Sequence, residues 1–480
     1  MKAYKIVIFI FSVLGMLALI AWTFPVEGVK AGPIQFEFPS LSEVLAVNEE
    51  PEELQLSPEE LLQQRLDALV AAKDNEYLDY IKNSEARFYL PNNDITFFDD
   101  LFVQLENCDK KQLRIVHYGD SQIEEDRMSS YLRERFQNEF GGSGVGMLPA
   151  VPKSGATHTV AESINPKDRI PYYIAYGPAS ARASHRRYGP MAQIAHIDTV
   201  TTISFRTREA ENYPHCQTFN RVRVRMQGSG SLSFTSGGVR TELKCDTAKA
   251  KAGTRLYEAI LPKPVKNGTL VLSGYMDVQT VQLDGTTVVV LDNVPMRGCS
   301  GTIFTGIERQ SIESFYKDEN VALIILQYGG NSMPYVKSDK AIEKFCSDTK
   351  RQIEFFHQIA PGAKILYVGP SDMSTSIGGQ MQTYAHLPAF VEALQKTVTE
   401  SGAAFWNMFQ AMGGKGSMVQ WVKARPQLAG EDYVHFTNKG AQRISEILYG
   451  TFDIYYKYYR FRNYERYSMA DSLSVEPDTL

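Results

Sequence analysis

The sequence predicts an α/β domain with a parallel sheet, interrupted by an inserted all-β sandwich and preceded by a membrane-spanning helix. Residues 6–24 form a charge-free apolar run, and strand and helix patterns alternate in two separate stretches, about 100–145 and 293–455. Between these stretches helical periodicity disappears and short alternating runs take over. Alternation of strands and helices is typical of a parallel sheet covered by helices on both faces.

Composition narrows the class of protein before any motif is considered. The 480 residues are 43% hydrophobic and 22% charged, with a formal net charge of −5. These values are ordinary for a globular chain, so they exclude disorder over most of the length. They also exclude a nucleic-acid binder that depends on bulk positive charge.

The apolar run predicts where the chain works. It spans about 19 residues, enough to cross a hydrocarbon core as a helix, and Lys2 and Lys5 precede it. Positive charge on the amino side keeps that end in the cytoplasm. We therefore expect a single-pass protein of a bacterial inner membrane with its body in the periplasm. The alternative is a signal sequence cleaved near residues 29–31, followed by secretion to the periplasm.

The α/β elements follow from apolar runs and helical periodicity. The strands are expected at 113–118, 321–327, 364–368 and 403–408. The helices are expected at 58–86 with Ser57 as cap, 127–140, 339–358, 387–401 and 438–449. Neither stretch completes a domain alone, so we predict one α/β domain interrupted by an insert.

The insert is predicted from alternation and turn signals. Residues 221–226 alternate with period 2, and Asn267-Gly268 and Asp284-Gly285 predict hairpin turns. The complete prediction is a membrane anchor at 1–24, a linker at 25–56, an N-terminal helical segment at 57–111, the α/β domain at 112–149 and 293–455, the β-sandwich at 150–292 and a C-terminal tail at 456–480.

Cysteine and histidine spacing offers no metal site. The five cysteines form no C-x-x-C pair, and the eight histidines show no H-x-x-x-H spacing. We expect no metal and no cofactor. Of the possible disulfides, Cys216–Cys245 is the first to test.

Three short motifs contain candidate catalytic residues. Gly119-Asp120-Ser121 follows the first predicted strand, Gly330-Asn331 follows the strand at 321–327, and Asp432 precedes His435 by three positions before the last helix. Polar residues at the carboxyl ends of parallel strands lie where such sheets place their sites. An aspartate can orient a histidine whose other ring nitrogen faces a serine.

In this order the motifs resemble those of the SGNH, or GDSL, hydrolase superfamily. Gly301, in the segment 297–302, matches that family's second glycine-containing motif. The resemblance covers residues 112–145 and 293–455 and implies a flavodoxin-like three-layer domain. Ser332 stands where many members have aspartate after the Gly-x-Asn motif, which leaves the oxyanion donor in place.

The resemblance also implies a role for each matched residue. Ser121 would be the nucleophile, His435 the general base and Asp432 its orienting carboxylate. The oxyanion hole would comprise the backbone N–H groups of Ser121 and Gly301 and the side chain of Asn331.

An SGNH domain with a sandwich at this place resembles peptidoglycan O-acetylesterases and related polysaccharide acetylesterases, whose insert is similar to a carbohydrate-binding module. We therefore expect a serine esterase that removes O-acetyl groups from an acetylated polysaccharide or peptidoglycan. One alternative is a polysaccharide O-acetyltransferase working with a membrane-bound O-acyltransferase partner. Another is an anchored glycan-binding protein without catalysis. No nucleic-acid partner is expected.

Overall fold

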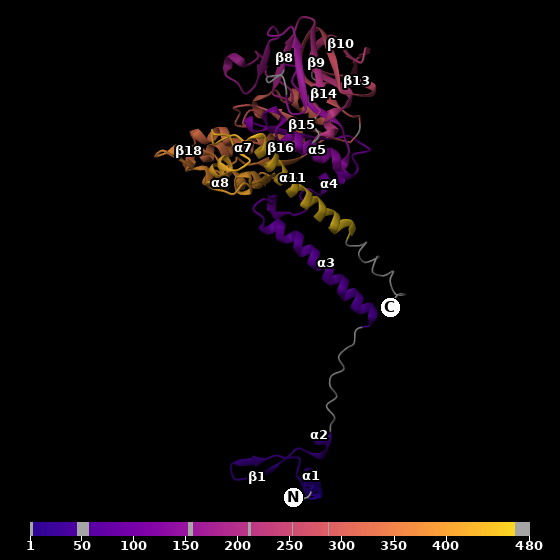
Figure 1. Cartoon of the computed structure of the whole chain (residues 1–480), viewed down its shortest axis with the longest axis vertical. Coiled ribbons are helices and arrows are strands. Elements are labelled where there is room, and N and C mark those ends of the chain that lie inside the picture. The colour runs from indigo at the N-terminus through magenta and orange to yellow at the C-terminus, as the bar shows by residue number, and fades with distance from the viewer. Residues whose placement is uncertain are drawn as a thin grey trace. The chain divides into compact units, whose positions relative to one another are not determined.

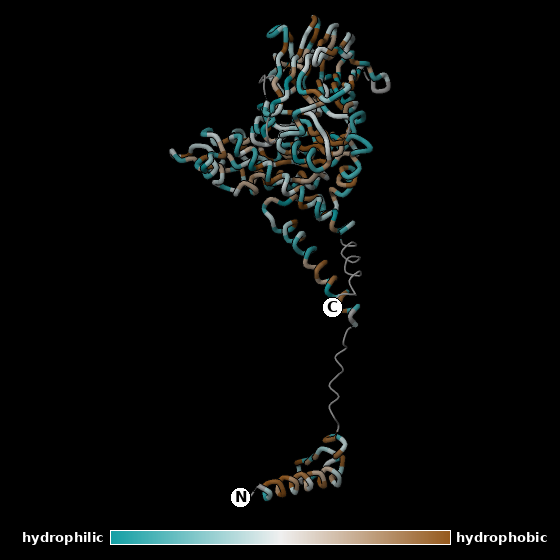
Figure 2. The backbone as a smooth tube through the Cα atoms, turned by 45° about the vertical axis from the view of Figure 1, so that its right-hand side comes forward, coloured by the Kyte–Doolittle hydropathy of each residue, from teal (hydrophilic) through white to brown (hydrophobic). Residues whose placement is uncertain are grey.

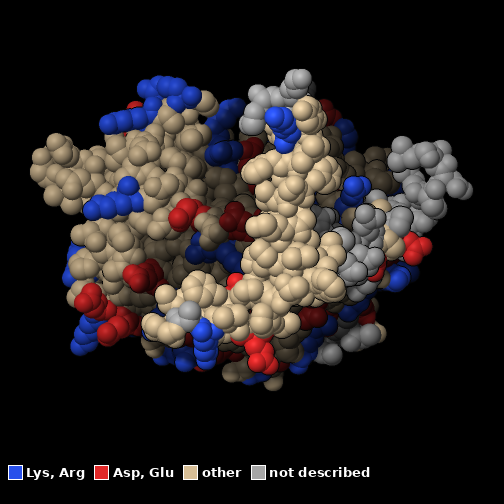
Figure 3. Space-filling view, turned by 90° about the horizontal axis from the view of Figure 1, so that it is seen from below, with Lys and Arg blue, Asp and Glu red and all other residues tan. Residues whose placement is uncertain are grey.

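The computed structural model describes residues 3–45, 57–151, 157–209, 213–251, 253–286 and 288–465. The chain divides into two compact units, Met1–Leu69 and Val70–Leu480. Figure 1 shows helices and strands mixed in the second unit, which carries both sheets discussed below. Figure 3 shows both signs of charge interspersed over the face that it presents.

The first unit begins with the predicted apolar helix. α1 (Ala3–Thr23) contains a window, Tyr4–Thr23, with a mean hydropathy of 2.6. In Figure 2 this helix is the long run of brown near the N-terminus. By length and composition it can cross a membrane, although a signal sequence has the same properties.

The predicted linker, 25–56, contains local order that its lack of periodicity did not indicate. β1 (Val29–Ala31) and β2 (Ile34–Phe36) pair antiparallel, and α2 (Leu41–Leu45) follows. Residues 46–56 lie outside the described part of the chain.

α3 (Pro58–Asn83) confirms the predicted helix and its cap. The Glu60 backbone N–H donates to Ser57 Oγ at 3.2 Å, and the Ser57 N–H donates to Glu60 Oε2 at 2.7 Å. This reciprocal capping box pairs backbone donors that a helix start leaves unpaired.

A parallel sheet forms the centre of the second unit, as predicted. Its strands are β15 (Val289–Pro295), β4 (Leu113–Gly119), β16 (Val321–Gln327), β17 (Lys364–Val368) and β20 (Ala404–Trp406), in that order. Numbered along the chain, this is the 2-1-3-4-5 order of flavodoxin-like sheets. β3 (Phe88–Tyr89) joins the far edge antiparallel to β20.

Helices cover both faces of this sheet. On one face lie α6 (Arg309–Asp318), α7 (Asp339–Ile359) and α8 (Leu387–Glu400). On the other lie α4 (Asp99–Glu106), α5 (Ser129–Phe140) and α11 (Asn438–Arg460). β4 shows the alternation directly: Tyr118 packs against Phe356 of α7, whereas the next residue back, His117, bonds to Ser129 of α5.

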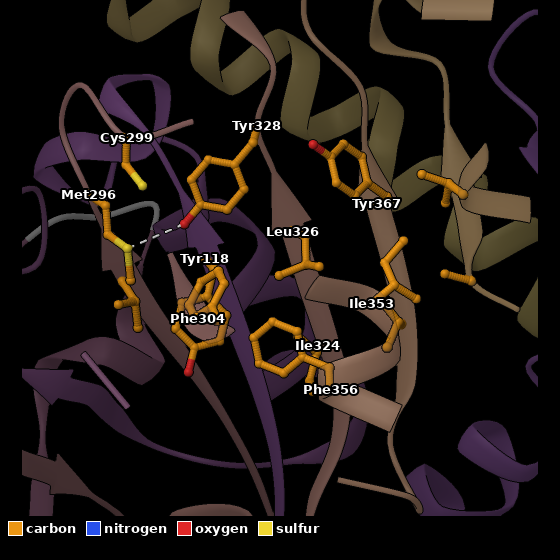
Figure 4. Packing of buried hydrophobic residues seen from close by; sticks show 14 of the residues in the cluster. Tyr118, Met296, Cys299, Phe304, Ile324, Leu326, Tyr328, Ile353, Phe356 and Tyr367 are labelled. Atoms are coloured by element: carbon orange, nitrogen blue, oxygen red, sulfur yellow. Dashed lines mark hydrogen bonds between the residues drawn. The ribbon is translucent and has the colours of Figure 1, made fainter. Parts of the chain in front are cut away.

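Figure 4 shows the core on the α7 side. The Tyr118, Phe304 and Phe356 rings pack against one another at tilted or edge-on angles, and the Tyr328 hydroxyl points to Met296 Sδ at 3.5 Å. Tyr328 is the first residue after β16, so this core lies directly beneath the carboxyl edge of the sheet.

The last helix is longer than predicted. α11 continues to Arg460 rather than ending at Tyr449, and a π-helical turn, Phe461–Glu465, follows. Aromatic residues drive the extension, because Tyr456 and Tyr459 both pack on Phe102 of α4. The rest of the predicted tail, 466–480, lies outside the described residues.

The predicted all-β region forms a ten-stranded antiparallel sheet. Two 18-residue strands, β10 (Phe219–Ser236) and β14 (Asn267–Asp284), pair over nearly their whole length and carry the others. β10 is flanked by β13 (Thr254–Val265) and β11 (Val239–Glu242), and β12 (Lys244–Lys251) pairs with β13. β14 is flanked by β5 (Gly144–Leu148), β8 (Gln193–Ile197) and β9 (Thr201–Thr207), while β6 (Val160–Asn165) and β7 (Tyr172–Ile174) complete the edge.

The strand pairing differs from the predicted insert, 150–292, at both ends. β5 begins at Gly144 and already belongs to the antiparallel sheet. β15, which begins at Val289, pairs parallel to β4 and belongs to the other sheet. In the glycine-rich segment before residue 150, Gly144–Leu148 therefore form a strand of the antiparallel sheet.

Two predicted hairpin turns are wrong. Asn267-Gly268 lies inside β14, where it pairs with β9, and Asp284-Gly285 ends β14 before the chain returns to the parallel sheet. The two-residue turn between β10 and β11 is instead Gly237-Gly238, whose φ angles of 55° and 78° suit a type I′ turn.

A buried ion network joins the two sheets. Arg114 of β4 contacts Asp292 of β15 at 2.6 Å and Asp284 of β14 at 2.7 Å. The other members extend from β10 to the end of α6; they are Arg221, Arg223, Arg225, Asp318 and Glu319. All eight side chains are at most 11% exposed, so the network is part of the interior.

All five cysteines are unpaired, so the suggested Cys216–Cys245 disulfide is wrong. Cys216 is buried, and its Sγ lies 4.0 Å from Nη1 of Arg133. Burial raises the pKa of the Cys216 thiol to about 12, which keeps it protonated.

Candidate active site

A pocket lies at the carboxyl edge of the parallel sheet. β4, β16 and β17 end next to one another there, and the segments after them meet because parallel strands share that edge. The pocket has a volume of about 420 Å³. Its lining comes from these segments and from the loop before α11, and includes Asp120, Ser121, Gln122, Tyr328, Gly330, Asn331, Pro370, Met373, Val434 and His435.

The structure brings Ser121, His435 and Asp432 into one hydrogen-bonded line. Ser121 Oγ lies 2.8 Å from His435 Nε2, and His435 Nδ1 lies 2.7 Å from Asp432 Oδ2. Ser121 stands at the start of a 3-10 turn, Ser121–Asp126, whereas the other two residues lie more than 300 positions later. A serine that contacts an oriented imidazole is the arrangement required for nucleophilic catalysis.

The Asp432 carboxylate organises the loop as well as the ring. Its Oδ1 accepts the backbone N–H groups of Val434 and His435, each at 3.0 Å. Partial burial raises the pKa of Asp432, but these two bonds and the bond from the His435 ring together outweigh burial and hold the pKa below its usual value. Asp432 is therefore ionised at neutral pH.

Two further residues, Gln122 and Arg127, hold the loop around His435 (the histidine loop) against the 3-10 turn Ser121–Asp126 (the nucleophile turn). The Gln122 side chain donates to Val434 O at 2.7 Å and accepts from the Phe436 N–H at 3.3 Å. Arg127 donates to Phe436 O at 3.1 Å and also to Ser121 O. Gln122 directly follows the serine motif, but no local pattern indicates its long-range contacts.

Asp120 is buried beside the nucleophile. Burial raises its pKa to about 6, although Oδ1 accepts the Gln122 N–H at 2.9 Å. Its Oδ2 accepts from the Asn331 amide at 3.1 Å. Asp120 therefore couples the serine turn to the residue after β16.

The three predicted oxyanion donors, Ser121, Gly301 and Asn331, lie in different surroundings. The Ser121 N–H begins its turn, where a helix leaves its first donors without an intrahelical partner. Asn331 lines the pocket, but its Nδ2 donates to Asp120 Oδ2 and to Cys299 O, both at 3.1 Å. To serve an oxyanion, Asn331 must exchange one of these bonds for the substrate oxygen.

Gly301 does not line the pocket. Its N–H donates to Cys299 Sγ at 3.3 Å, and its φ is 76°. A Cβ there would lie 2.5 Å from the Tyr328 ring, so only glycine fits. In this state Gly301 permits close packing of its loop on the residue after β16.

Comparison with solved structures finds a similar architecture in a known protein. A peptidoglycan O-acetylesterase structure is 17% identical, with a TM-score of 0.61; the alignment covers 75% of this chain and 96% of that one. A family two carbohydrate esterase from Cellvibrio japonicus is 10% identical, with a TM-score of 0.25 over 62% of this chain and 98% of that one. A candidate GDSL-like lipase from Parabacteroides merdae is 13% identical, with a TM-score of 0.28 over 35% of this chain and 74% of that one. The last two scores are too low to establish a shared architecture.

Other comparisons give no match. No protein-family model and no curated protein sequence matches the chain. The architecture, the order of the strands and the shared fold of the peptidoglycan O-acetylesterase agree with the resemblance in the motifs. The chain therefore has an SGNH/GDSL hydrolase-like fold.

Proposed function

We propose that the chain is a serine esterase that removes O-acetyl groups from a cell-envelope or other polysaccharide. The observation that carries this proposal is the continuous line from Ser121 Oγ through the His435 ring to Asp432, with contacts of 2.8 and 2.7 Å, at the edge of an open pocket. A structural serine has no need of an imidazole held in this way by a carboxylate.

In the acylation step Ser121 Oγ attacks the carbonyl carbon of the ester. Its proton passes to His435 Nε2, and the imidazolium that forms is stabilised by ionised Asp432. The carbonyl oxygen becomes an oxyanion, for which the Ser121 N–H and the Asn331 amide are the available donors. When the intermediate collapses, the sugar oxygen leaves with the proton from Nε2 and the acetyl group stays on Ser121.

Water then completes the reaction. His435 Nε2 accepts a proton from water as the water oxygen attacks the acetyl carbon. Collapse of the second intermediate returns that proton to Ser121 Oγ and releases acetic acid. Ser121, Asn331 and His435 line one pocket, which supports their acting together in these steps.

The substrate class is proposed from the pocket and the comparison. The pocket beside Ser121 is small enough to suit a short acyl group rather than a polymer chain. The solved structure that shares the fold is named as a peptidoglycan O-acetylesterase. The apolar helix α1 supports a site of action outside the cytoplasm, either anchored or secreted.

Product analysis with an activated acetyl donor tests the proposal. The purified full chain is incubated with the donor, with and without oligosaccharide, and the products are weighed by mass spectrometry. We expect free acetate as the main product in both mixtures. Acetylated oligosaccharide as the main product would contradict the esterase and support an O-acetyltransferase that uses a membrane-bound acyl donor. No turnover of the donor would indicate a glycan-binding protein without catalysis.

A further inference from the structure

A second cavity lies on the other side of the nucleophile turn. It lies between that turn and the antiparallel sheet, and its space, including the open solvent at its mouth, is about 720 Å³. Ser121, the first residue of the turn, lines the catalytic pocket, whereas Glu124, Glu125 and Asp126 line this cavity. Glu125 and Asp126 both have positive φ angles, 59° and 65°, which direct the chain away from the catalytic pocket.

Most of the cavity wall is apolar. The apolar residues come from β5, from the loop before β8 and from the end of β15; they are Val145, Met147, Leu148, Met191 and Pro295. Two of the wall carboxylates pair with arginines, and Glu125 is exposed to solvent. Asp126 accepts from Arg133 at 2.6 Å, and Glu124 pairs with Arg297 at 3.2 Å.

Glu162 of β6 is the exception. Only 9% of this residue is exposed, and its Oε2 atom has no hydrogen-bond partner. Its carboxyl group forms no ion pair with any cation among the described residues. Burial raises the pKa of Glu162 to about 8, so the group is a neutral carboxylic acid at pH 7.

A buried polar group without a partner costs free energy unless a ligand supplies the missing bond. A neutral carboxylic acid offers one donor and one acceptor, which suits an amide or a hydroxyl rather than a cation. The apolar wall suits a small methyl group. An acetamido group contains both an amide and a methyl group.

We propose that this cavity binds an N-acetylated amino-sugar unit of the polysaccharide, with the Glu162 carboxyl donating to its amide carbonyl. The inference rests on the proposed function, because it places a second sugar of the same substrate beside the turn that carries Ser121. The acetamido methyl group lies against the apolar wall. Glu162 makes no contact with the reacting ester and contributes affinity alone.

Calorimetry with three oligosaccharides of equal length tests this inference. Chitin, chitosan and cellulose fragments differ only in carrying acetamido, ammonium or hydroxyl groups at one position of each sugar. We expect the full chain to bind the chitin fragment most tightly. Tighter binding of the chitosan fragment would indicate a cation site. Equal binding of the cellulose fragment, or no binding of any fragment, would also overturn the proposal.

Variants of Glu162 identify the group that binds. Glu162→Leu should weaken the chitin fragment by about tenfold or more, because a buried amide carbonyl loses its donor. Glu162→Gln should bind within about threefold of the wild type, because the side-chain amide keeps a donor and an acceptor. Exposed Glu242 of β11 provides the matched control, Glu242→Gln, with no change expected. Equal losses in the Leu and Gln variants would overturn the neutral-acid interpretation.

The pH dependence gives an independent readout. Above a pKa of about 8 the carboxyl loses its proton and its donor, so wild-type affinity should fall about tenfold per pH unit. The Glu162→Gln variant should show no such fall. The other charged groups at the wall, Glu124, Glu125, Asp126, Arg133 and Arg297, are unchanged in that variant and cannot produce the difference.

Esterase activity separates the two proposals. Both Glu162 variants should hydrolyse a small acetyl ester at the wild-type rate, which also shows that they are folded. Lost sugar binding with intact hydrolysis supports the cavity, whereas intact sugar binding without hydrolysis in the wild type refutes only the proposed reaction.

Discussion

Two groups of ionisable side chains in the described part of Val70–Leu480 differ in exposure and pairing. In the network around Arg114 every carboxylate faces an arginine, and the Arg114, Asp284 and Asp292 side chains are fully buried. In the hydrogen-bonded line of Ser121, His435 and Asp432, the last two side chains are 38% and 51% exposed. Removing a member of the first group should change stability, and removing a member of the second should change rate.

The pKa values follow the same division. Burial raises the pKa of Glu319, but Arg223, Arg114 and Arg225 outweigh it and hold the value at about 2. Asp120 is buried next to Ser121 without such a group of arginines, and its pKa rises to about 6. Glu319 therefore stays charged well below neutral pH, whereas the charge of Asp120 is adjustable near pH 6.

The largest expected effect is on rate. His435→Ala removes the base that contacts Ser121 Oγ, and kcat for a small acetyl ester should fall by about 10⁶-fold. The midpoint of urea unfolding should stay close to that of the wild type, since the ring is partly exposed. A variant that keeps near-full rate would show that His435 is not the base.

Arg114→Met should lower stability and leave the rate unchanged, the opposite of His435→Ala. It leaves Asp292 and Asp284 buried without their shared partner, and the free energy of unfolding should fall by about 3–5 kcal/mol. The kcat of the protein that remains folded should be unchanged. Arg240→Met is the matched control, because its pair with Glu242 is 65% and 58% exposed and should cost less than about 1 kcal/mol. Equal losses in the two variants would contradict the role of burial.

Asp432→Asn should have an intermediate effect on rate. The amide oxygen can still accept the Val434 and His435 N–H groups, so the loop keeps its shape, but the ring loses its charged acceptor. We expect kcat to fall by about 10⁴-fold, less than in His435→Ala. A loss as large as that of His435→Ala would mean that the carboxylate does more than orient the ring.

The smallest effect concerns pH. An acid whose folded pKa is raised binds its proton more tightly when folded, so its contribution to stability falls as pH rises through that pKa. For Asp120, with a pKa of about 6, this lowers the free energy of unfolding by about 1 kcal/mol between pH 5 and pH 6. Urea titrations at both pH values should show this decrease disappear in Asp120→Asn. Glu319 contributes almost no slope there, because its stabilisation is lost as pH falls from its usual pKa of 4.5 to its lowered pKa of about 2.

The parallel sheet could be predicted because its strands are short apolar runs with clear ends. β16 and β17 have the predicted bounds, 321–327 and 364–368. The strands of the antiparallel sheet were harder to predict. Its turn signals, Asn267-Gly268 among them, lie within long strands whose pairing is set by distant neighbours rather than by local sequence.

The candidate site shows the same limit. Ser121, Asp432 and His435 stand in local motifs and could be named from sequence, as could Asn331. Gln122 could not be assigned a role, because its partners lie 312 and 314 positions away. The network and Glu162 also escaped prediction, since whether a charged side chain is buried, and with which partner, depends on contacts between β4, β6, β10, β14 and β15 that no local pattern encodes.

Labelling with a fluorophosphonate tests the central claim most directly. The reagent phosphonylates a serine only when an adjacent base activates it. The purified full chain should gain one phosphonyl group, located at Ser121 by peptide mass spectrometry, and acetyl ester hydrolysis should stop in proportion. Ser121→Ala should remain unlabelled and inactive while unfolding at the wild-type urea concentration. An unlabelled wild type, or a Ser121→Ala variant that still hydrolyses the ester, would contradict the assignment of Ser121 as nucleophile.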